Sequence, residues 1–164
     1  MTKGMTSVFR ITRRPYARDP LSGEGAHRYG GRWSSTGTRL AYASEHVSLA
    51  MIEYLIHVDA GDPPTDLVLV HAEIPDSVSR RLLPAAELPR HWRRTPAPPE
   101  LAEIGDQFAC EGRFAVLIVP SVLAPMESNW LINPIHRDSG KIKLRKTEPL
   151  RYDPRFFQNW RARN

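Results

Sequence analysis

The stretch HRYGGRWSSTGTRLAYASEHVSLAMIEYLIHV (residues 27–58) contains a glycine-rich loop, a short apolar segment and an amphipathic segment, in that order. Residues 40–44 (LAYAS) predict a buried strand, in which Tyr42 is by default a core residue. Ser44 can cap a helix over residues 45–57. The apolar stripe of this helix comprises Leu49, Ala50, Ile52 and Ile56. The stretch therefore predicts a strand followed directly by a helix that buries one face.

More strands and a second helix are predicted on either side of this stretch. The expected strands cover residues 7–12, 66–74, 114–119, 129–133 and 141–150, the last of them as an edge strand. Residues 84–99 are rich in proline and predict a long irregular connection. A helix begins at Pro99 and ends near Gly112, and its Cys110 is expected to be a small buried thiol. Strands and helices do not alternate strictly, so the predicted class is α+β, with residues 1–164 as a single domain.

The chain is basic, and most of its basic residues are arginines. Lysine and arginine together number 23 against 18 acidic residues, and only four of the 23 are lysines. The formal net charge is +5 and the pI is near 9.7. A guanidinium grips phosphate or carboxylate in pairs, so this composition favours an anionic ligand: a nucleic acid, a nucleotide or an acidic protein. A solvated basic surface explains the composition equally well.

Several kinds of site are excluded by motifs that the sequence lacks. No GxGxxG precedes a helix, and neither a GxxxxGK[ST] phosphate loop nor a GxSxG nucleophile elbow is present. The single cysteine excludes an internal disulfide, and the six histidines have no metal-binding spacing, so we expect no metal. No apolar run could span a membrane and no signal-peptide core is present, so we expect a cytoplasmic protein.

Three places in the sequence carry side chains that could do chemistry. Glu53 falls on the apolar stripe of its helix, either as a rim residue in an ion pair or as a carboxylate that projects into a cleft. Arg32 and Trp33 follow two glycines, which indicates either close approach to a ligand or a turn before a core tryptophan. Ser121 follows a buried strand, where ligand-binding groups and ordinary turn residues are both common.

These residues resemble the motifs of the RES-domain family, the toxins of RES–Xre type II toxin–antitoxin modules. The arginine, glutamate and serine of the family match Arg32 in GGRWS, Glu53 in AMIEYL and Ser121 in VPSVL. The site tyrosine of the family matches Tyr42. The resemblance extends over residues 7–150 and is densest between residues 29 and 57.

A late motif and one departure complete the comparison. The segment ESNWLINPIH resembles the late motif of the family and supplies Asn129, Asn133 and Pro134. Ser34 stands where many relatives have asparagine after the tryptophan. The departure concerns that one group and leaves the family resemblance intact.

The resemblance implies a fold similar to ADP-ribosyltransferases and diphtheria-toxin-like enzymes, with mixed sheets and flanking helices. The implied activity is destruction of NAD⁺ at the nicotinamide–ribose bond, by hydrolysis or phosphorolysis, with growth arrest until an antitoxin neutralises the toxin. Some relatives resemble transferases that attach ADP-ribose to a protein. The implied partner is an Xre-like antitoxin in a hetero-oligomeric complex. The toxin would contact nucleic acid only indirectly, through this antitoxin.

The resemblance also implies roles for the candidate site residues. Glu53 would stabilise the positive charge that develops on the ribose during cleavage. Arg32 would clamp the diphosphate, with Arg10 as a second candidate. The candidate stacking surfaces for nicotinamide or adenine are Tyr29, Trp33 and Tyr42, and the candidate hydrogen-bond partners of the amide or ribose are Ser121 and Asn133. Such a site needs neither a metal nor a cysteine.

Two other classes of function remain open from the sequence. The basic composition also suits a nucleic-acid-binding module, although acidic residues are interspersed and no known binding motif is present. A protein-interaction domain would bind a partner and turn over no NAD⁺. Residues 151–164 mix aromatics with arginines and would either dock on the core or join a partner interface.

Overall fold

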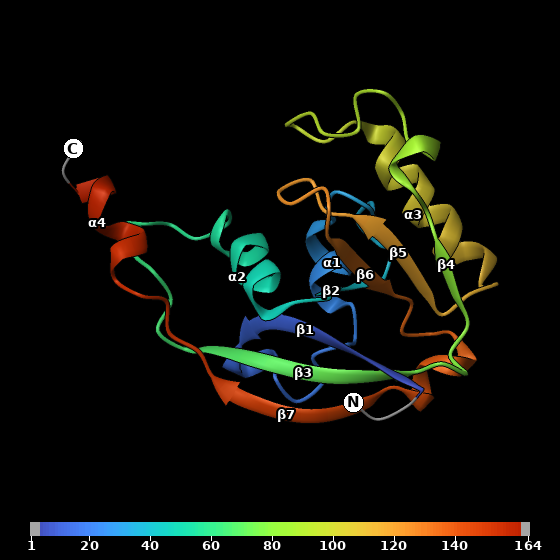
Figure 1. Cartoon of the computed structure of the whole chain (residues 1–164), viewed down its shortest axis with the longest axis horizontal. Helices are drawn as coiled ribbons and strands as arrows, with labels where there is room; N and C mark the ends of the chain where they lie inside the picture. Colours follow the sequence, from blue (N-terminus) through green and yellow to red (C-terminus); the bar gives the residue numbers. More distant parts are fainter. Residues whose placement is uncertain (1–3, 162–164) are drawn as a thin grey trace.

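The computed structural model describes residues 4–161, and its centre is a seven-stranded sheet with the order β4-β5-β6-β2-β1-β3-β7 (Figure 1). The strands are β1 (Met5–Arg13), β2 (Ala41–Ser44), β3 (Leu67–Pro75), β4 (Arg80–Leu82), β5 (Val116–Pro120), β6 (Ser128–Ile132) and β7 (Lys143–Pro149). The α-helices are α1 (Glu24–Tyr29), α2 (Val47–Leu55), α3 (Pro99–Glu111) and α4 (Arg155–Arg161). Short 3-10 helices cover Arg14–Tyr16, Ala85–Glu87 and Arg137–Lys141.

The two halves of the sheet meet at a narrow junction between β1 and β2. Strand β1 pairs with β3 along its whole length, from Met5 opposite Pro75 to Arg13 opposite Leu67. Strand β1 meets β2 only where Phe9 lies opposite Ser44. Figure 1 accordingly shows β1, β3 and β7 side by side below α2, while β2, β6 and β5 run at an angle to them. The side chain of a residue in β1 just beyond this junction can therefore reach the backbone of β2.

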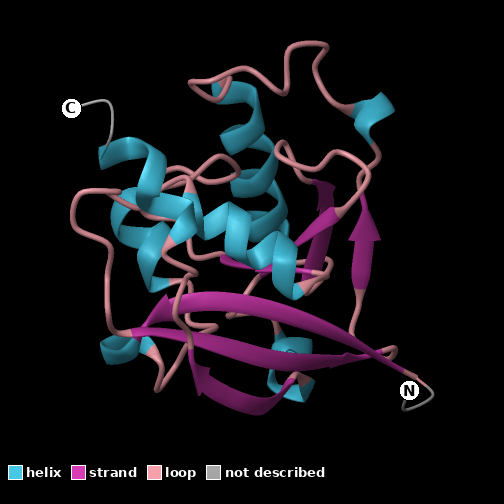
Figure 2. Ribbon diagram, turned by 60° about the vertical axis from the view of Figure 1, so that its left-hand side comes forward, coloured by secondary structure: helices cyan, strands magenta, loops and turns pink. Residues whose placement is uncertain are grey.

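Helices α2 and α3 cover one face of the sheet (Figure 2). In one apolar cluster Ala50 of α2 is buried with Ile11 of β1. In a second, Leu101 of α3 is buried with Leu117 and Leu131 of β5 and β6. Because side chains alternate along a strand, the same face carries Tyr42, Ser44 and Asn129. The opposite face has its own cluster, which includes Val8, Ala43, Val116, Trp130 and Ile132.

The predicted secondary structure agrees with this fold in most elements. Each predicted strand is present, with β7 at an edge of the sheet, and the helix predicted from Pro99 to Gly112 is α3. The sequence did not predict β4 or the short helix α1. Residues 151–164 include α4, and the Tyr152 hydroxyl donates to the Met51 carbonyl at 2.6 Å, which docks this segment on α2. Residues 162–164 lie outside the described part.

Three local predictions are wrong. Ser44 does not cap the helix, which begins at Val47 with His46 at the N-cap position and without a side-chain cap. The Ser44 hydroxyl instead bonds Asn129 on the neighbouring strand. Ile56 lies beyond the last turn and is 56% exposed. Cys110 is exposed because the buried face of α3 passes through Leu101, Gly105 and Phe108, and two further residues rotate the thiol about 200° away from Phe108.

No helix within residues 4–161 is long and apolar enough to cross a membrane. This agrees with the absence of long apolar runs in the sequence.

Close packing at Gly105 gives a first prediction. A Cβ atom built there would lie 1.6 Å from the Trp33 carbonyl oxygen, which is backbone and cannot rotate away. We expect Gly105→Ala to lower the free energy of unfolding by about 2–3 kcal/mol, because α3 must shift off the loop that carries Arg32. Thermal denaturation should show a melting temperature lower by about 5–10 °C. Gly25→Ala in α1 is the control, since nothing lies within 4 Å of its Cβ position; equal melting temperatures for the two variants would contradict the prediction.

Candidate active site

Glu53 occupies the middle of the candidate site, between α2 and the sheet. Its Oε1 atom accepts two hydrogen bonds, one from the Ser121 hydroxyl at 2.6 Å and one from the Asn129 amide at 2.6 Å. Ser121 follows β5 and Asn129 lies in β6, so the helix and two strands meet at a single carboxylate oxygen. Both bonds converge on Oε1, which leaves Oε2 available for another partner.

Ser121 is fully buried and all of its hydrogen-bonding capacity is used. Its Oγ accepts from the backbone N–H groups of Leu123 at 3.1 Å and Ala124 at 3.0 Å, while its only proton points to Glu53. A hydroxyl has one proton and two lone pairs, so this one has nothing left to offer a ligand. The resemblance implied that Ser121 bonds the amide or ribose; its surroundings instead suit the task of holding Glu53.

Arg32 lies on the glycine loop, and no carboxylate of residues 4–161 is within 4.0 Å of its guanidinium. Burial lowers the pKa of the Arg32 guanidinium, and the charge of Glu53 opposes this shift, so the two groups interact. The Arg32 Nη1 atom donates to the carbonyl oxygens of Trp92 and Arg94, each at 3.1 Å, and thereby ties the proline-rich connection to the site. Gly30 has a φ of +69°, a conformation that favours glycine, at the turn that leads into Arg32.

The Tyr42 side chain holds the loop that carries Arg32 through two hydrogen bonds of its hydroxyl group. Its hydroxyl accepts from the Trp33 backbone N–H at 3.1 Å and bonds the Ser34 hydroxyl at 2.8 Å. The absence of a side chain at Gly31 makes this possible, because a Cβ atom there would lie 2.8 Å from the tyrosine oxygen. Burial raises the pKa of the Tyr42 phenol, which keeps it protonated. Ser34 is thus part of the support of this loop.

Arg10 lies at the junction of the two sheet halves and has no acidic partner among the described residues. Its Nη1 donates to the Tyr42 carbonyl oxygen at 2.7 Å, and its buried Nε has no partner within residues 4–161. Burial lowers the pKa of this guanidinium. In that part of the chain no carboxylate lies within 4.0 Å of it, whereas Arg28 and Arg145, for example, pair with Glu24 and Glu73. A largely buried, unpaired guanidinium favours an anionic ligand.

Three predicted site residues lie elsewhere. Trp33 is 3% exposed and packs in the core around α3, so it offers no face to a ligand. Tyr29 is 80% exposed at the end of α1. Asn133 is buried and donates to the Ala109 carbonyl oxygen at 3.2 Å, beyond the end of β6 that is remote from Asn129. The asparagine beside Glu53 is therefore Asn129, which the sequence marked only as part of the late motif.

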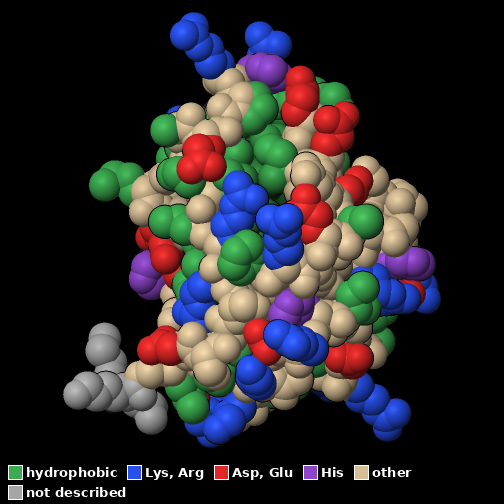
Figure 3. Space-filling view, turned by 90° about the vertical axis from the view of Figure 1, so that its right-hand side faces the viewer, with side chains coloured by type: hydrophobic (Ala, Val, Ile, Leu, Met, Phe, Trp, Pro, Cys, Tyr) green, Lys and Arg blue, Asp and Glu red, His purple; other side chains and the backbone are tan. Residues whose placement is uncertain are grey.

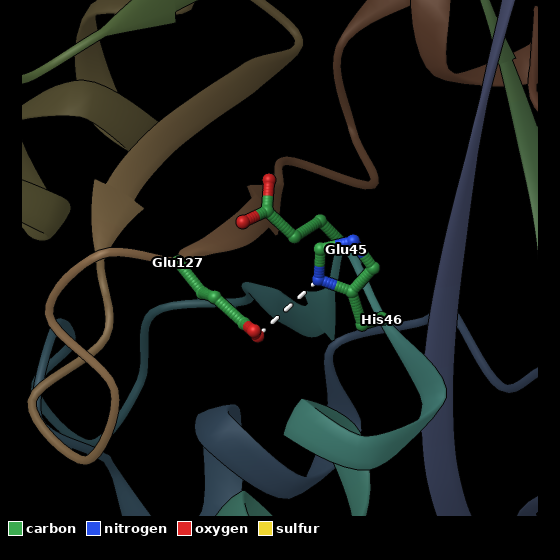
Figure 4. Close-up of side chains that lie close together, drawn as sticks. All are labelled: Glu45, His46 and Glu127. Carbon is green, nitrogen blue, oxygen red and sulfur yellow. Dashed lines mark ion pairs between the residues drawn. The ribbon is translucent and has the colours of Figure 1, made fainter.

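A second polar cluster, formed by Glu45, His46 and Glu127, joins the start of α2 to the start of β6 (Figure 4). His46 Nδ1 lies 3.3 Å from Glu127 Oε2, and Glu45 Oε1 accepts from the Ser128 N–H at 2.7 Å. An ion pair and a backbone hydrogen bond account for the arrangement, and His46 is exposed. We therefore assign no metal to this cluster, and the expectation of a metal-free site remains a prediction.

The comparisons with known sequences agree on one family. A family model described as RES domain matches residues 7–153. The "Prs ADP-ribosylating toxin" of Sphingobium sp. (strain YBL2) is 41% identical over 157 residues, which cover 93% of this chain and 98% of that protein. A "Toxin Res" of Yersinia enterocolitica is 37% identical over 151 residues, which cover 91% of this chain and 98% of that protein.

A solved structure has the same fold. The toxin–antitoxin complex MbcT–MbcA of M. tuberculosis contains a chain that superposes with a TM-score of 0.71 at 20% identity, covering 96% of this chain and 90% of that chain. At this identity the likeness concerns the fold alone. Together with the strand order it confirms the predicted α+β class, with a mixed sheet and flanking helices.

Proposed function

The chain belongs to the RES domain family, and from this premise we propose that it is an enzymatic toxin that cleaves the nicotinamide–ribose bond of NAD⁺. The observation that carries the proposal is one carboxylate, Glu53, fixed by two donors on Oε1. Two arginines, Arg32 and Arg10, support it, since neither has a carboxylate partner within residues 4–161. A dinucleotide with a pyridinium cation at one end and a diphosphate in the middle needs such a combination of one fixed negative group and cationic clamps.

The chemistry of cleavage suits the free oxygen of Glu53. When the bond between ribose C1′ and the pyridinium nitrogen breaks, the electron pair stays on nitrogen and nicotinamide leaves as a neutral molecule. Positive charge then develops on the ribose, as in an oxocarbenium-like transition state. Because Oε1 is occupied by Ser121 and Asn129, the atom that would face the ribose is Oε2. Water or phosphate would then attack C1′ and lose a proton.

The two arginines would hold the diphosphate of NAD⁺ in place. Among residues 4–161, Arg10 uses only Nη1, for its bond to the Tyr42 carbonyl oxygen, and Arg32 uses only Nη1, for its bonds to the loop carbonyls. Each guanidinium thus keeps donors for phosphate oxygens. Trp33 is buried and therefore offers no stacking surface to nicotinamide or adenine. Tyr29, just before the glycine loop, is exposed.

Transfer of ADP-ribose to a protein is the second candidate function. It is favoured by one observation, the name "Prs ADP-ribosylating toxin" of a relative that is 41% identical. The same carboxylate and clamps would serve this reaction, in which a side chain of the acceptor protein replaces water at C1′.

We also propose that an antitoxin, of the Xre-like kind, neutralises the toxin by covering the site. The structural neighbour from M. tuberculosis belongs to a toxin–antitoxin complex, which supports a protein partner of this sort for the present chain.

The charge distribution gives less support to a nucleic-acid-binding domain. Several arginines pair with carboxylates, among them Arg13 with Asp66 and Arg39 with Glu24. On the face in Figure 3, basic side chains are mixed with acidic ones and form no continuous stripe. A backbone-tracking nucleic-acid site would need such a stripe.

Incubation of the purified protein with NAD⁺ alone, with added phosphate, or with the proteins of a bacterial lysate as acceptors tests the proposal. We expect loss of NAD⁺ and release of nicotinamide, measured by mass spectrometry. Free ADP-ribose would identify hydrolysis, ADP-ribose phosphate would identify phosphorolysis, and an added ADP-ribose mass on an acceptor protein would identify transfer. Intact NAD⁺ under all three conditions, with a folded protein, would overturn the proposal.

A further inference from the structure

Two polar side chains of the sheet, Ser44 and Asn129, form a chain of hydrogen bonds that ends at Glu53. They lie opposite each other in the register of β2 and β6 and face α2. The Ser44 hydroxyl donates to Asn129 Oδ1 at 2.8 Å, and Asn129 Nδ2 donates to Glu53 Oε1 at 2.6 Å. Ser44 is buried, with 4% of its surface exposed, so bulk water does not compete for the hydrogen bond between its hydroxyl and Asn129.

The direction of the Asn129 amide is fixed by its neighbours. A carboxylate can only accept, so the Nδ2 end of the amide must face Glu53. The Oδ1 end then faces Ser44, which is free to donate. If the amide were reversed, its oxygen would meet a carboxylate oxygen at 2.6 Å without a proton between them. Ser44 therefore completes an arrangement in which each buried group has a partner.

We propose that Asn129 is a positioning residue for Glu53 and that Ser44 orients its amide. A single donor such as Ser121 fixes the distance to Oε1 but leaves the carboxylate free to turn about that bond. The second donor, from another strand, removes this freedom and holds Oε2 in one direction. Asn129 thus acts through Glu53 and does not touch the substrate; this inference rests on the proposed NAD⁺ cleavage.

Kinetics of two alanine variants test the inference. We expect Asn129→Ala to lower kcat for NAD⁺ loss by about 10²-fold, because misplacement of a reacting group by about 1 Å has effects of that size. KM should stay within about threefold, since the clamping arginines are untouched. Ser44→Ala should have the same sign and a smaller effect. Ser139→Ala removes a hydroxyl that bonds the Asn133 carbonyl at 2.5 Å, and as the control it should leave kcat unchanged.

A third variant separates positioning from a structural role. In Asn129→Asp two carboxylates would meet, and one shared proton would restore the lost donor as the pH falls. We expect this variant to be nearly inactive at about pH 8 and to gain activity toward about pH 6, relative to wild type at each pH. The other charged groups on the elements packed here are Arg32 on the glycine loop and the Glu45, His46 and Glu127 cluster, and the variant shares all of them with the wild type measured at the same pH.

The outcomes distinguish this inference from the proposed function. If the wild type does not consume NAD⁺, the proposed function fails. If the wild type is active and Asn129→Ala keeps full kcat, or Asn129→Asp follows the wild-type pH profile, the positioning role is overturned. If Asn129→Ala does not fold, the pH profile of Asn129→Asp, which has the same shape as asparagine, decides alone.

Discussion

Replacing Glu53 by glutamine is expected to abolish NAD⁺ loss while leaving the fold intact. Glutamine keeps an oxygen that can accept from Ser121 and Asn129, so the two 2.6 Å bonds survive. The atom that changes is Oε2, which becomes a neutral amide group and can no longer stabilise a cation. Loss of one electrostatic stabiliser of a transition state typically lowers the rate about 10²–10³-fold. The measurement is kcat for nicotinamide release, together with the melting temperature.

The matched control for this variant is Glu127→Gln. Glu127 is another partly exposed carboxylate near the start of β6, but it pairs with His46 and not with the candidate site residues. We expect it to retain wild-type kcat. Full activity of purified Glu53→Gln would remove the carboxylate from the mechanism, and a large drop in its melting temperature would show that Glu53 is a structural residue.

The strands and the helix that carries Glu53 could be predicted because each leaves a local pattern. Alternation marks β1 and β3, an apolar run marks β5, and helical spacing around Leu49 marks the buried face of α2. The position of Glu53 on that face left two interpretations open, a rim residue in an ion pair or a carboxylate that projects into a cleft. Each of these patterns involves residues that are close together in the chain, so it can be recognised from the sequence alone.

The hydrogen bonds of Glu53 could not be predicted from local patterns, because they depend on strand register over long sequence distances, although the family resemblance had placed Ser121 in the same site. Ser121 and Asn129 are 68 and 76 residues away from Glu53 in the chain. Ser44 illustrates the same point: its local context suits a helix cap, yet its pairing with Asn129 across β2 and β6 determines its actual bond. Asn133 has the same residue type as Asn129 but lies beyond the other end of the strand.

The sequence places Arg10 on a strand, but it does not predict that Arg10 has no carboxylate partner within residues 4–161. The structure shows that its guanidinium reaches the Tyr42 carbonyl oxygen at 2.7 Å and no carboxylate among the described residues. Composition had suggested that arginines serve either an anionic ligand or a solvated surface. A guanidinium whose Nε is buried and which has no carboxylate partner in residues 4–161 favours the first of these two roles.

Replacing Arg10 by methionine is expected to weaken NAD⁺ binding without destabilising the fold. NAD⁺ would lose a diphosphate contact, and we expect kcat/KM to fall by about 10²-fold. The folded protein would lose one hydrogen bond, worth about 1 kcal/mol, but would also be relieved of a desolvated charge. The free energy of unfolding should therefore stay within about 1 kcal/mol of wild type, or rise. Kinetics and denaturant unfolding measure the two effects.

Arg145→Met is the control, because it removes the same charge from an arginine that pairs with Glu73 on β3, at the sheet edge. It should leave kcat/KM unchanged. NAD⁺ should raise the melting temperature of the wild type and of Arg145→Met, since a ligand stabilises the state that binds it, but should raise that of Arg10→Met much less. An Arg10→Met protein that is destabilised by more than about 2 kcal/mol and binds NAD⁺ normally would mean that Arg10 joins the two halves of the sheet and takes no part in holding substrate.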